Sequence, residues 1–161
     1  MFVAFKEMPG DSRVWIYQAD KTLTTQQVEL VEENIRRFLE QWSAHGKDLK
    51  CSGTVLHHRF LIISVDEKHH GASGCSIDSS VHFITELGQH LGVNWFDRSK
   101  IAFTVNNEVF IENQKDIKQK IAEGAIDGDT LTFNNLVTNI EEFEKNWVIP
   151  AKDSWLGRFF N

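Results

Sequence analysis

Residues 51–65 restrict the fold most strongly, because two strand-like segments are separated there by only two residues. Segments 51–56 and 59–65 are rich in β-branched and apolar side chains, and His57-His58 joins them. So short a join predicts an antiparallel hairpin. The unbroken apolar run 60–63 is typical of a strand that is buried on both faces of its sheet.

Helices are predicted on both sides of this hairpin. Thr24 followed three residues later by Gln27 has the form of a capping box, and Gly46 is a natural end for the helix that it starts. A second helical stripe ends at Gly92. The apolar positions of the two stripes are Val28, Val31, Ile35, Phe38, Leu39 and Trp42 in the first, and Ile77, Val81, Ile84, Leu87 and Leu91 in the second.

A strand before the first helix and a hairpin after the second complete the pattern. Residues 13–18 mix β-branched and aromatic side chains, as is typical of a strand. Segments 100–105 and 108–111 are predicted to form a hairpin with its turn at Asn106-Asn107, because asparagine tolerates the left-handed backbone of tight turns. The order is strand, helix, strand, strand, helix, strand. It predicts an α+β, ferredoxin-like βαββαβ domain, with two helices on one face of an antiparallel sheet.

The pattern changes after residue 113. We expect a short helix at 116–123, a turn at Asp127-Gly128-Asp129, a strand at 130–133 and a helix at 140–147. The end carries Trp147, Trp155, Phe159 and Phe160, and such side chains are expected to pack back on the protein. Without a linker or repeat, residues 1–161 read as one domain, with a core at 1–112 and an extension at 113–161.

Charge and composition limit the class of protein. A net charge of −6 and a pI near 5.6 oppose broad binding to nucleic acids or anionic membranes. No apolar run approaches the roughly 18 residues that span a bilayer, and residues 1–7 are too short and charged for a signal peptide. We therefore expect a cytoplasmic protein in which Cys51 and Cys75 are free thiols.

Candidate chemistry concentrates in residues 69–80, between the hairpin and the second helix. The helix N-terminus favours an anion, so Ser73, Gly74, Ser76 and Asp78 form one candidate ligand site. A second interpretation makes Cys75 a nucleophile, with His69 or His70 as its base. In the third, the serines cap the helix, Asp78 complements its dipole, and Cys75 is a small buried residue.

Two other kinds of site are less well supported. Asp66, Glu67, His69, His70 and Cys75 are of metal-ligand type, but their spacing matches no familiar ligand pattern, so no metal or cofactor is predicted. The aromatic strands and His57-His58-Arg59 suggest RNA binding, because ferredoxin-like RNA-binding proteins stack bases on strand aromatics. However, the RNP consensus is absent and the overall charge is negative.

Residues 71–80, together with the C-terminal segments 133–137, Ser154-Trp155 and Arg158-Phe159-Phe160, resemble a family of small bacterial proteins often labelled "ABC transporter ATPase". The resemblance covers nearly the whole chain and implies no established activity. A P-loop needs a lysine for the phosphates, and Cys75 follows Gly74 where that lysine would stand. We therefore expect a binding or interaction module without ATPase activity, whose partner is an anionic small molecule or a protein. A thiol enzyme is the alternative, and an RNA-binding module is a weaker one.

Overall fold

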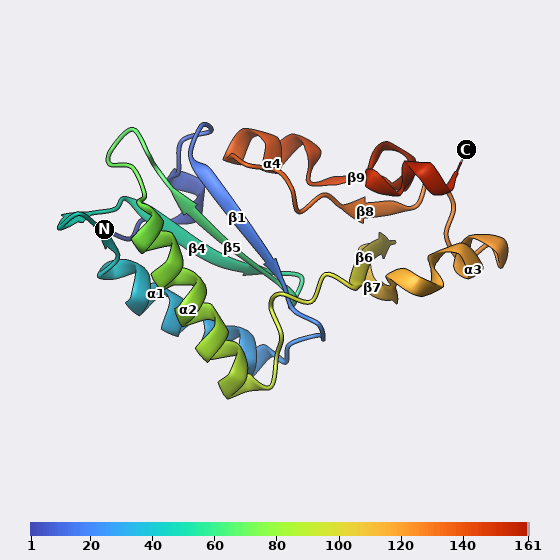
Figure 1. The fold of residues 1–161 in the computed structure, drawn as a ribbon, viewed down its shortest axis with the longest axis horizontal. Coiled ribbons are helices and arrows are strands. Elements are labelled where there is room, and N and C mark those ends of the chain that lie inside the picture. The colour runs from blue at the N-terminus through green and yellow to red at the C-terminus, as the bar shows by residue number, and fades with distance from the viewer. Residues whose placement is uncertain (161) are drawn as a thin grey trace.

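The computed structural model describes residues 1–160 and shows an α+β protein (Figure 1). Helices α1 and α2 cover one face of a first antiparallel sheet, and a second antiparallel sheet packs with α4 against its other face. The elements are β1 (Arg13–Gln18), α1 (Thr25–Glu40), β2 (Ser43–Ala44), β3 (Lys47–Asp48), β4 (Cys51–Leu56), β5 (Phe60–Val65), α2 (Gly74–Leu91), β6 (Lys100–Val105), β7 (Glu108–Asn113), α3 (Ile117–Ala122), β8 (Leu131–Phe133), α4 (Ile140–Asn146) and β9 (Val148–Pro150).

The first sheet has the strand order β1-β5-β4, and β5 is antiparallel to both neighbours. The predicted β4–β5 hairpin is confirmed, and His57 and His58 turn the chain with left-handed φ angles of 54° and 51°. Every residue of β5 is buried, as its apolar run predicts. Successive side chains of β5 point to opposite faces of the sheet, so Leu61 and Ile63 pack toward the helices, and Phe60 and Ile62 pack toward the second sheet.

Both long helices form where the capping signals predict. The Thr24 hydroxyl accepts a hydrogen bond from the Gln27 N–H (3.1 Å), and Gly92 ends α2 with a φ of 67°. The first helix ends earlier than predicted, because α1 stops at Glu40. Gly46 lies instead in the tight turn between β2 and β3, with a φ of 75°.

The four-stranded ferredoxin-like sheet is not confirmed, because β6 does not join β1. It forms the predicted hairpin with β7 across Asn106-Asn107, but in the second sheet, whose order is β7-β6-β8-β9. The outer edge of β1 is occupied by the segment before α4, where the Val14 N–H donates to the Thr138 carbonyl (2.9 Å). The position expected for a fourth strand is therefore filled by residues much later in the chain.

The C-terminal third completes the second sheet. Strands β8 and β9 extend it beyond β6, so the sheet unites residues from both sides of position 112. As expected, Trp147 packs against the aromatic rings of Phe60 and Phe133, and Phe159 and Phe160 pack against a third apolar cluster. Trp155 differs from the expectation, because 47% of it is exposed. Among residues 1–160, no helix is both long and apolar enough to cross a membrane.

Candidate functional site

The start of α2 uses its serines for capping. The Ser73 hydroxyl accepts from the Ser76 N–H (3.1 Å), and the Ser73 N–H donates to the Ser76 hydroxyl (2.8 Å). Ser76 is buried, whereas Gly74 and Asp78 are exposed. The reciprocal bonds match the capping interpretation, because both hydroxyls already satisfy backbone groups of the first turn.

Cys75 is exposed beside this cap, so the expectation of a small buried cysteine there is wrong. The residues described include no hydrogen-bond partner for its sulfur. His70 Nε2 donates to the Ala44 carbonyl (3.0 Å), and His69 is exposed on the loop. The thiol and the two imidazoles are therefore near in sequence without forming a nucleophile–base pair in this conformation.

The acidic residues of this region are engaged in ion pairs. Asp66 lies 3.5 Å from the Lys50 ammonium, and Glu67 lies 3.8 Å from the Arg13 guanidinium. Within residues 1–160, no three histidine, cysteine or acidic side chains come together as a metal site would require.

The aromatic strands do not present a bare sheet face. Trp15 and Tyr17 pack against the cluster beneath the helices, where the ring of Tyr17 meets Phe96 edge-on at 5.6 Å. Arg59 is only 5% exposed, and its guanidinium donates to the Ala19 carbonyl (3.1 Å). Helices cover one face of the sheet and the second sheet covers the other, so bases could not stack on it as they do on an open RNA-binding sheet.

A concave site lies elsewhere, where β7 ends against the C-terminal turns. The cavity has a volume of about 710 Å³, within the range of small-molecule sites. The Gln114 N–H donates to the Ser99 carbonyl (2.8 Å), which fixes the chain as it leaves the sheet. We call this cavity the lysine cleft; its walls are Ser99, Asn113, Gln114, Lys115, Lys118 and Phe159.

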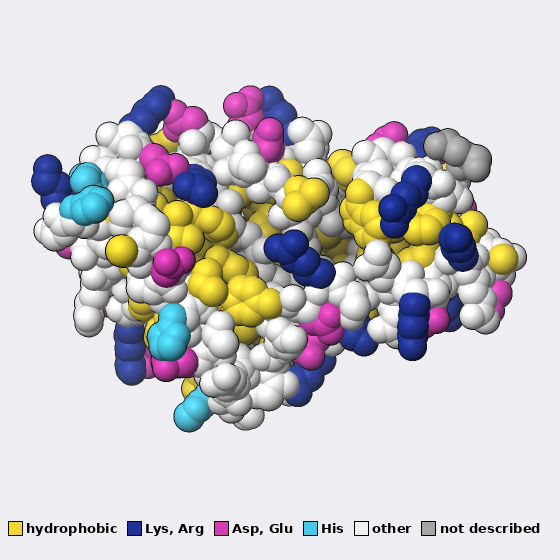
Figure 2. Space-filling model, viewed as in Figure 1, with side chains coloured by type: hydrophobic (Ala, Val, Ile, Leu, Met, Phe, Trp, Pro, Cys, Tyr) yellow, Lys and Arg dark blue, Asp and Glu magenta, His cyan; other side chains and the backbone are white. Residues whose placement is uncertain are grey.

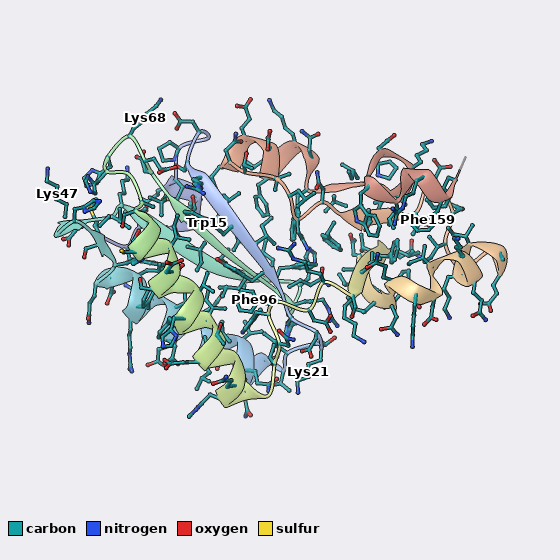
Figure 3. The ribbon with its side chains drawn as sticks, viewed as in Figure 1. Trp15, Lys21, Lys47, Lys68, Phe96 and Phe159 are labelled. Atoms are coloured by element: carbon teal, nitrogen blue, oxygen red, sulfur yellow. The ribbon has the colours of Figure 1, made fainter. Side chains whose placement is uncertain are left out.

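The lysine cleft combines positive charge with an aromatic wall. Lys115 and Lys118 are exposed, and neither forms an ion pair within residues 1–160. Arg158 adds a third cation at the Phe159 ring, 4.9 Å from its centroid. Figure 3 labels Phe159 between the C-terminal turns and α3. Figure 2 shows Lys and Arg side chains around exposed hydrophobic ones on this part of the molecule.

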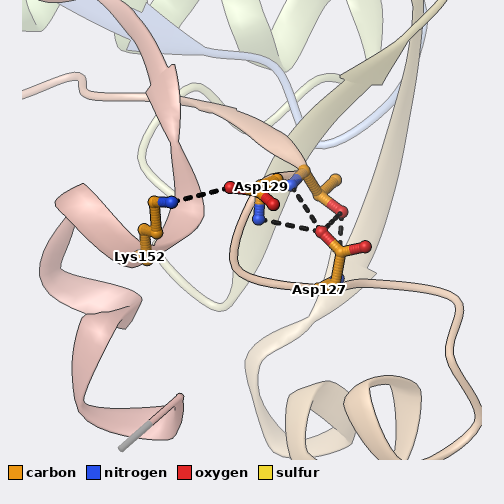
Figure 4. Close-up of polar contacts among 4 residues, drawn as sticks. Asp127, Asp129 and Lys152 are labelled. Atoms are coloured by element: carbon orange, nitrogen blue, oxygen red, sulfur yellow. Dashed lines mark hydrogen bonds and ion pairs between the residues drawn. The ribbon is translucent and has the colours of Figure 1, made fainter.

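The C-terminal turns that carry Phe159 are held by the predicted Asp127-Gly128-Asp129 turn (Figure 4). One carboxylate oxygen of Asp127 accepts from the backbone N–H groups of Asp129 (2.8 Å) and Thr130 (3.0 Å). Asp129 accepts from the Lys152 ammonium (2.8 Å), which raises the pKa of Lys152. These acidic groups thus serve to anchor the chain that forms one wall of the cleft.

A second hollow of about 390 Å³ lies between α4 and β9 and contains Glu142 and Asp153. Its acidic lining contrasts with that of the lysine cleft. Glu142 is also already engaged, because its carboxylate accepts from the Thr138 N–H (3.1 Å). This hollow is therefore the weaker candidate for an anion.

The fold and cleft define the class of protein: a compact α+β protein with a cationic, aromatic-walled cavity. Comparison of the chain with protein-family models, curated proteins and solved structures found no significant match. Sequence reasoning missed the cleft because its walls come from residues 99, 113–118 and 159, which share no local motif. The lysines of 115–120 and the Arg158-Phe159-Phe160 tail were the available signals.

Proposed function

We propose that this protein is a small binding module for an anionic ligand, held in the lysine cleft. The observation that carries the proposal is the pair of exposed ammonium groups, Lys115 and Lys118, in the wall of a cavity of about 710 Å³. Without ion-pair partners among the described residues, these groups are available to an anion. The cleft is a better place for it than the loop 69–76, where the Ser73 and Ser76 hydroxyls are occupied by capping.

The walls also favour a particular chemical form of ligand. Lysine ammonium groups bind phosphate or carboxylate groups as point charges, and the Phe159 ring offers a flat apolar surface. Asn113 is less available, because its side-chain oxygen accepts from Lys100 Nζ (2.6 Å). We therefore propose a ligand that joins an anionic group to an aromatic or other planar apolar group.

The other interpretations receive less support. A thiol enzyme would need a base for Cys75, and His70, the histidine nearest to it in sequence, donates to a backbone carbonyl. An RNA-binding module would need an accessible aromatic sheet face, and Trp15 and Tyr17 are packed against the core. A P-loop ATPase is disfavoured because Cys75 stands in place of the phosphate-binding lysine.

Calorimetric titration with 1-naphthyl phosphate tests the proposal, with inorganic phosphate and neutral 1-naphthol as comparison ligands. Lys118→Glu should weaken binding of both phosphates by about tenfold or more, because it reverses one charge in the cleft. Phe159→Leu should weaken the binding of naphthyl phosphate much more than the binding of inorganic phosphate, because it removes the aromatic ring.

Lys47→Glu is the matched control. Lys47 is exposed in the β2–β3 hairpin and lies at the opposite end of the molecule from Phe159 (Figure 3). The same charge reversal there should leave both affinities unchanged. Equal weakening by Lys47→Glu and Lys118→Glu would show diffuse electrostatics rather than a site. Absence of naphthyl phosphate binding up to about 1 mM would overturn the proposal.

A further inference from the structure

The four outer edges of the two main sheets differ in whether their backbone groups are covered. At β1 the segment before α4 lies alongside, with the Ile140 N–H donating to the Ser12 carbonyl (3.0 Å). At β4 the Cys51 N–H donates to the Met1 carbonyl (3.0 Å), and the Val55 N–H donates to a Glu32 carboxylate oxygen (3.2 Å). Both edges of the first sheet are thus occupied by the chain itself.

The β9 edge of the second sheet is protected from pairing in another way. The Ala151 N–H donates to the Thr130 carbonyl, so residues 149 and 151 face β8, and Val148 and Pro150 face outward. Proline has no N–H to donate, and it is a common residue on protected edges. This three-residue strand therefore offers few free backbone groups with which another strand could pair.

The β7 edge is open over six residues. The Gln114 N–H donates inward to Ser99, so alternation directs residues 108, 110 and 112 toward β6 and residues 109, 111 and 113 outward. Among residues 1–160, the outward N–H groups of Val109 and Ile111 have no hydrogen-bond acceptor. Figure 1 shows no strand beyond β7, and the strand contains neither lysine nor proline to discourage pairing.

The charges at the ends of β7 indicate what pairs with it. Glu108 is exposed at one end, and Lys115 is exposed just beyond the other. Antiparallel pairing of two copies, centred on Ile111 opposite itself, places Glu108 of each copy just past Asn113 of the other, at the strand end that Lys115 follows. The same register pairs residue 109 with 113, so all outward backbone groups meet in hydrogen-bonded pairs.

We propose that the β7 edge is a homodimer interface, in which β7 pairs antiparallel with β7 of a second copy. The contact is isologous, so it closes as a twofold dimer and joins the two four-stranded sheets into one. The antiparallel arrangement brings the exposed Glu108 of one copy to the strand end that Lys115 of the other copy follows, whereas a parallel arrangement would place like charges together.

Sedimentation equilibrium of the full chain, without added ligand, tests the interface. The mass should rise with concentration from 18.5 kDa toward twice that value. Glu108→Lys and Lys115→Glu should each weaken association by about tenfold or more, and the double variant should restore it. Circular dichroism confirms that each variant is folded. A monomer at all concentrations up to about 1 mM, or a double variant no better than the single ones, would overturn the proposal.

A cysteine cross-link tests the register independently. In a Cys75→Ser background, Ile111→Cys places two thiols opposite each other across the twofold axis, at the roughly 5.5 Å Cα separation that a disulfide accepts. Mild oxidation should give a covalent dimer. Val109→Cys, two residues away on the same face, should not cross-link, because position 109 lies opposite 113. Equal cross-linking by both variants would contradict this register.

Discussion

Gly88 provides the sharpest test of how α2 is joined to the rest of the protein. A Cβ atom at this position would lie 2.5 Å from the Val93 carbonyl oxygen and 2.9 Å from Trp95 Cδ1. The Val93 N–H donates back to the Gly88 carbonyl (2.8 Å), and Trp95 is only 3% exposed. The chain that leaves α2 is thus folded closely against the helix at Gly88, and no side chain fits between them.

The Gly88→Ala substitution is expected to destabilise the protein even though alanine favours helices. Helix propensity alone would stabilise it by about 1 kcal/mol. Overpacking typically costs about 1–3 kcal/mol, and the upper part applies here because one clashing atom belongs to the backbone. The expected net loss is about 1–2 kcal/mol in the free energy of unfolding, which corresponds to roughly 2–8 °C in melting temperature.

Gly74→Ala is the matched control in the same helix. Nothing lies within 4 Å of the Cβ that it adds, so the stability should stay constant or rise by up to about 1 kcal/mol. Urea denaturation and thermal melting followed by circular dichroism measure both variants. If Gly88→Ala is as stable as Gly74→Ala, the close approach of residues 93–95 does not restrict position 88, and the reasoning fails.

Two further predictions concern titratable groups. Cys75, which is exposed, should be alkylated in the native protein, whereas Cys51 is buried, and burial raises its pKa to about 11, so it should react only on unfolding. Mass spectrometry of Cys51→Ser and Cys75→Ser variants separates the two thiols, and rapid native labelling of Cys51 would contradict its burial. Burial against aromatic rings lowers the pKa of His57, so the unfolded chain binds a proton more readily and stability should decrease as the pH falls through about 6.5. The test is His57→Asn, because asparagine tolerates the left-handed backbone at this position. The urea midpoint of this variant should fall less between about pH 7.5 and about pH 5.5 than that of the unmodified protein. An equal fall in both proteins would mean that other groups cause the pH dependence.

Local patterns predicted the parts of the fold that are decided locally. The Thr24–Gln27 cap, the His57-His58 and Asn106-Asn107 turns and the Gly92 terminus are formed by neighbouring residues, and all are found. The helix at 116–123 and the helix at 140–147 are also found to within two residues. Alternation within 100–105 identifies a strand, but it is compatible with any neighbouring strand. The choice of partner for β6 therefore could not be predicted from its own residues.

The same physical limit applies to the candidate sites. A serine before a helix followed by a serine three residues later is the signature of a cap, and an anion site at a helix start uses the same backbone groups, so the Ser73–Ser76 pattern could not separate them. The lysine cleft exists only because β6 pairs with β7 and β8 instead of β1. That pairing brings the end of β7, with Lys115 and Lys118 just beyond it, within reach of the C-terminal turn that carries Phe159. The departure from the ferredoxin-like pattern is thus what creates the proposed binding site, and it also leaves β7 as an edge strand. A substitution that returned β6 to the edge of β1 would be expected to abolish both.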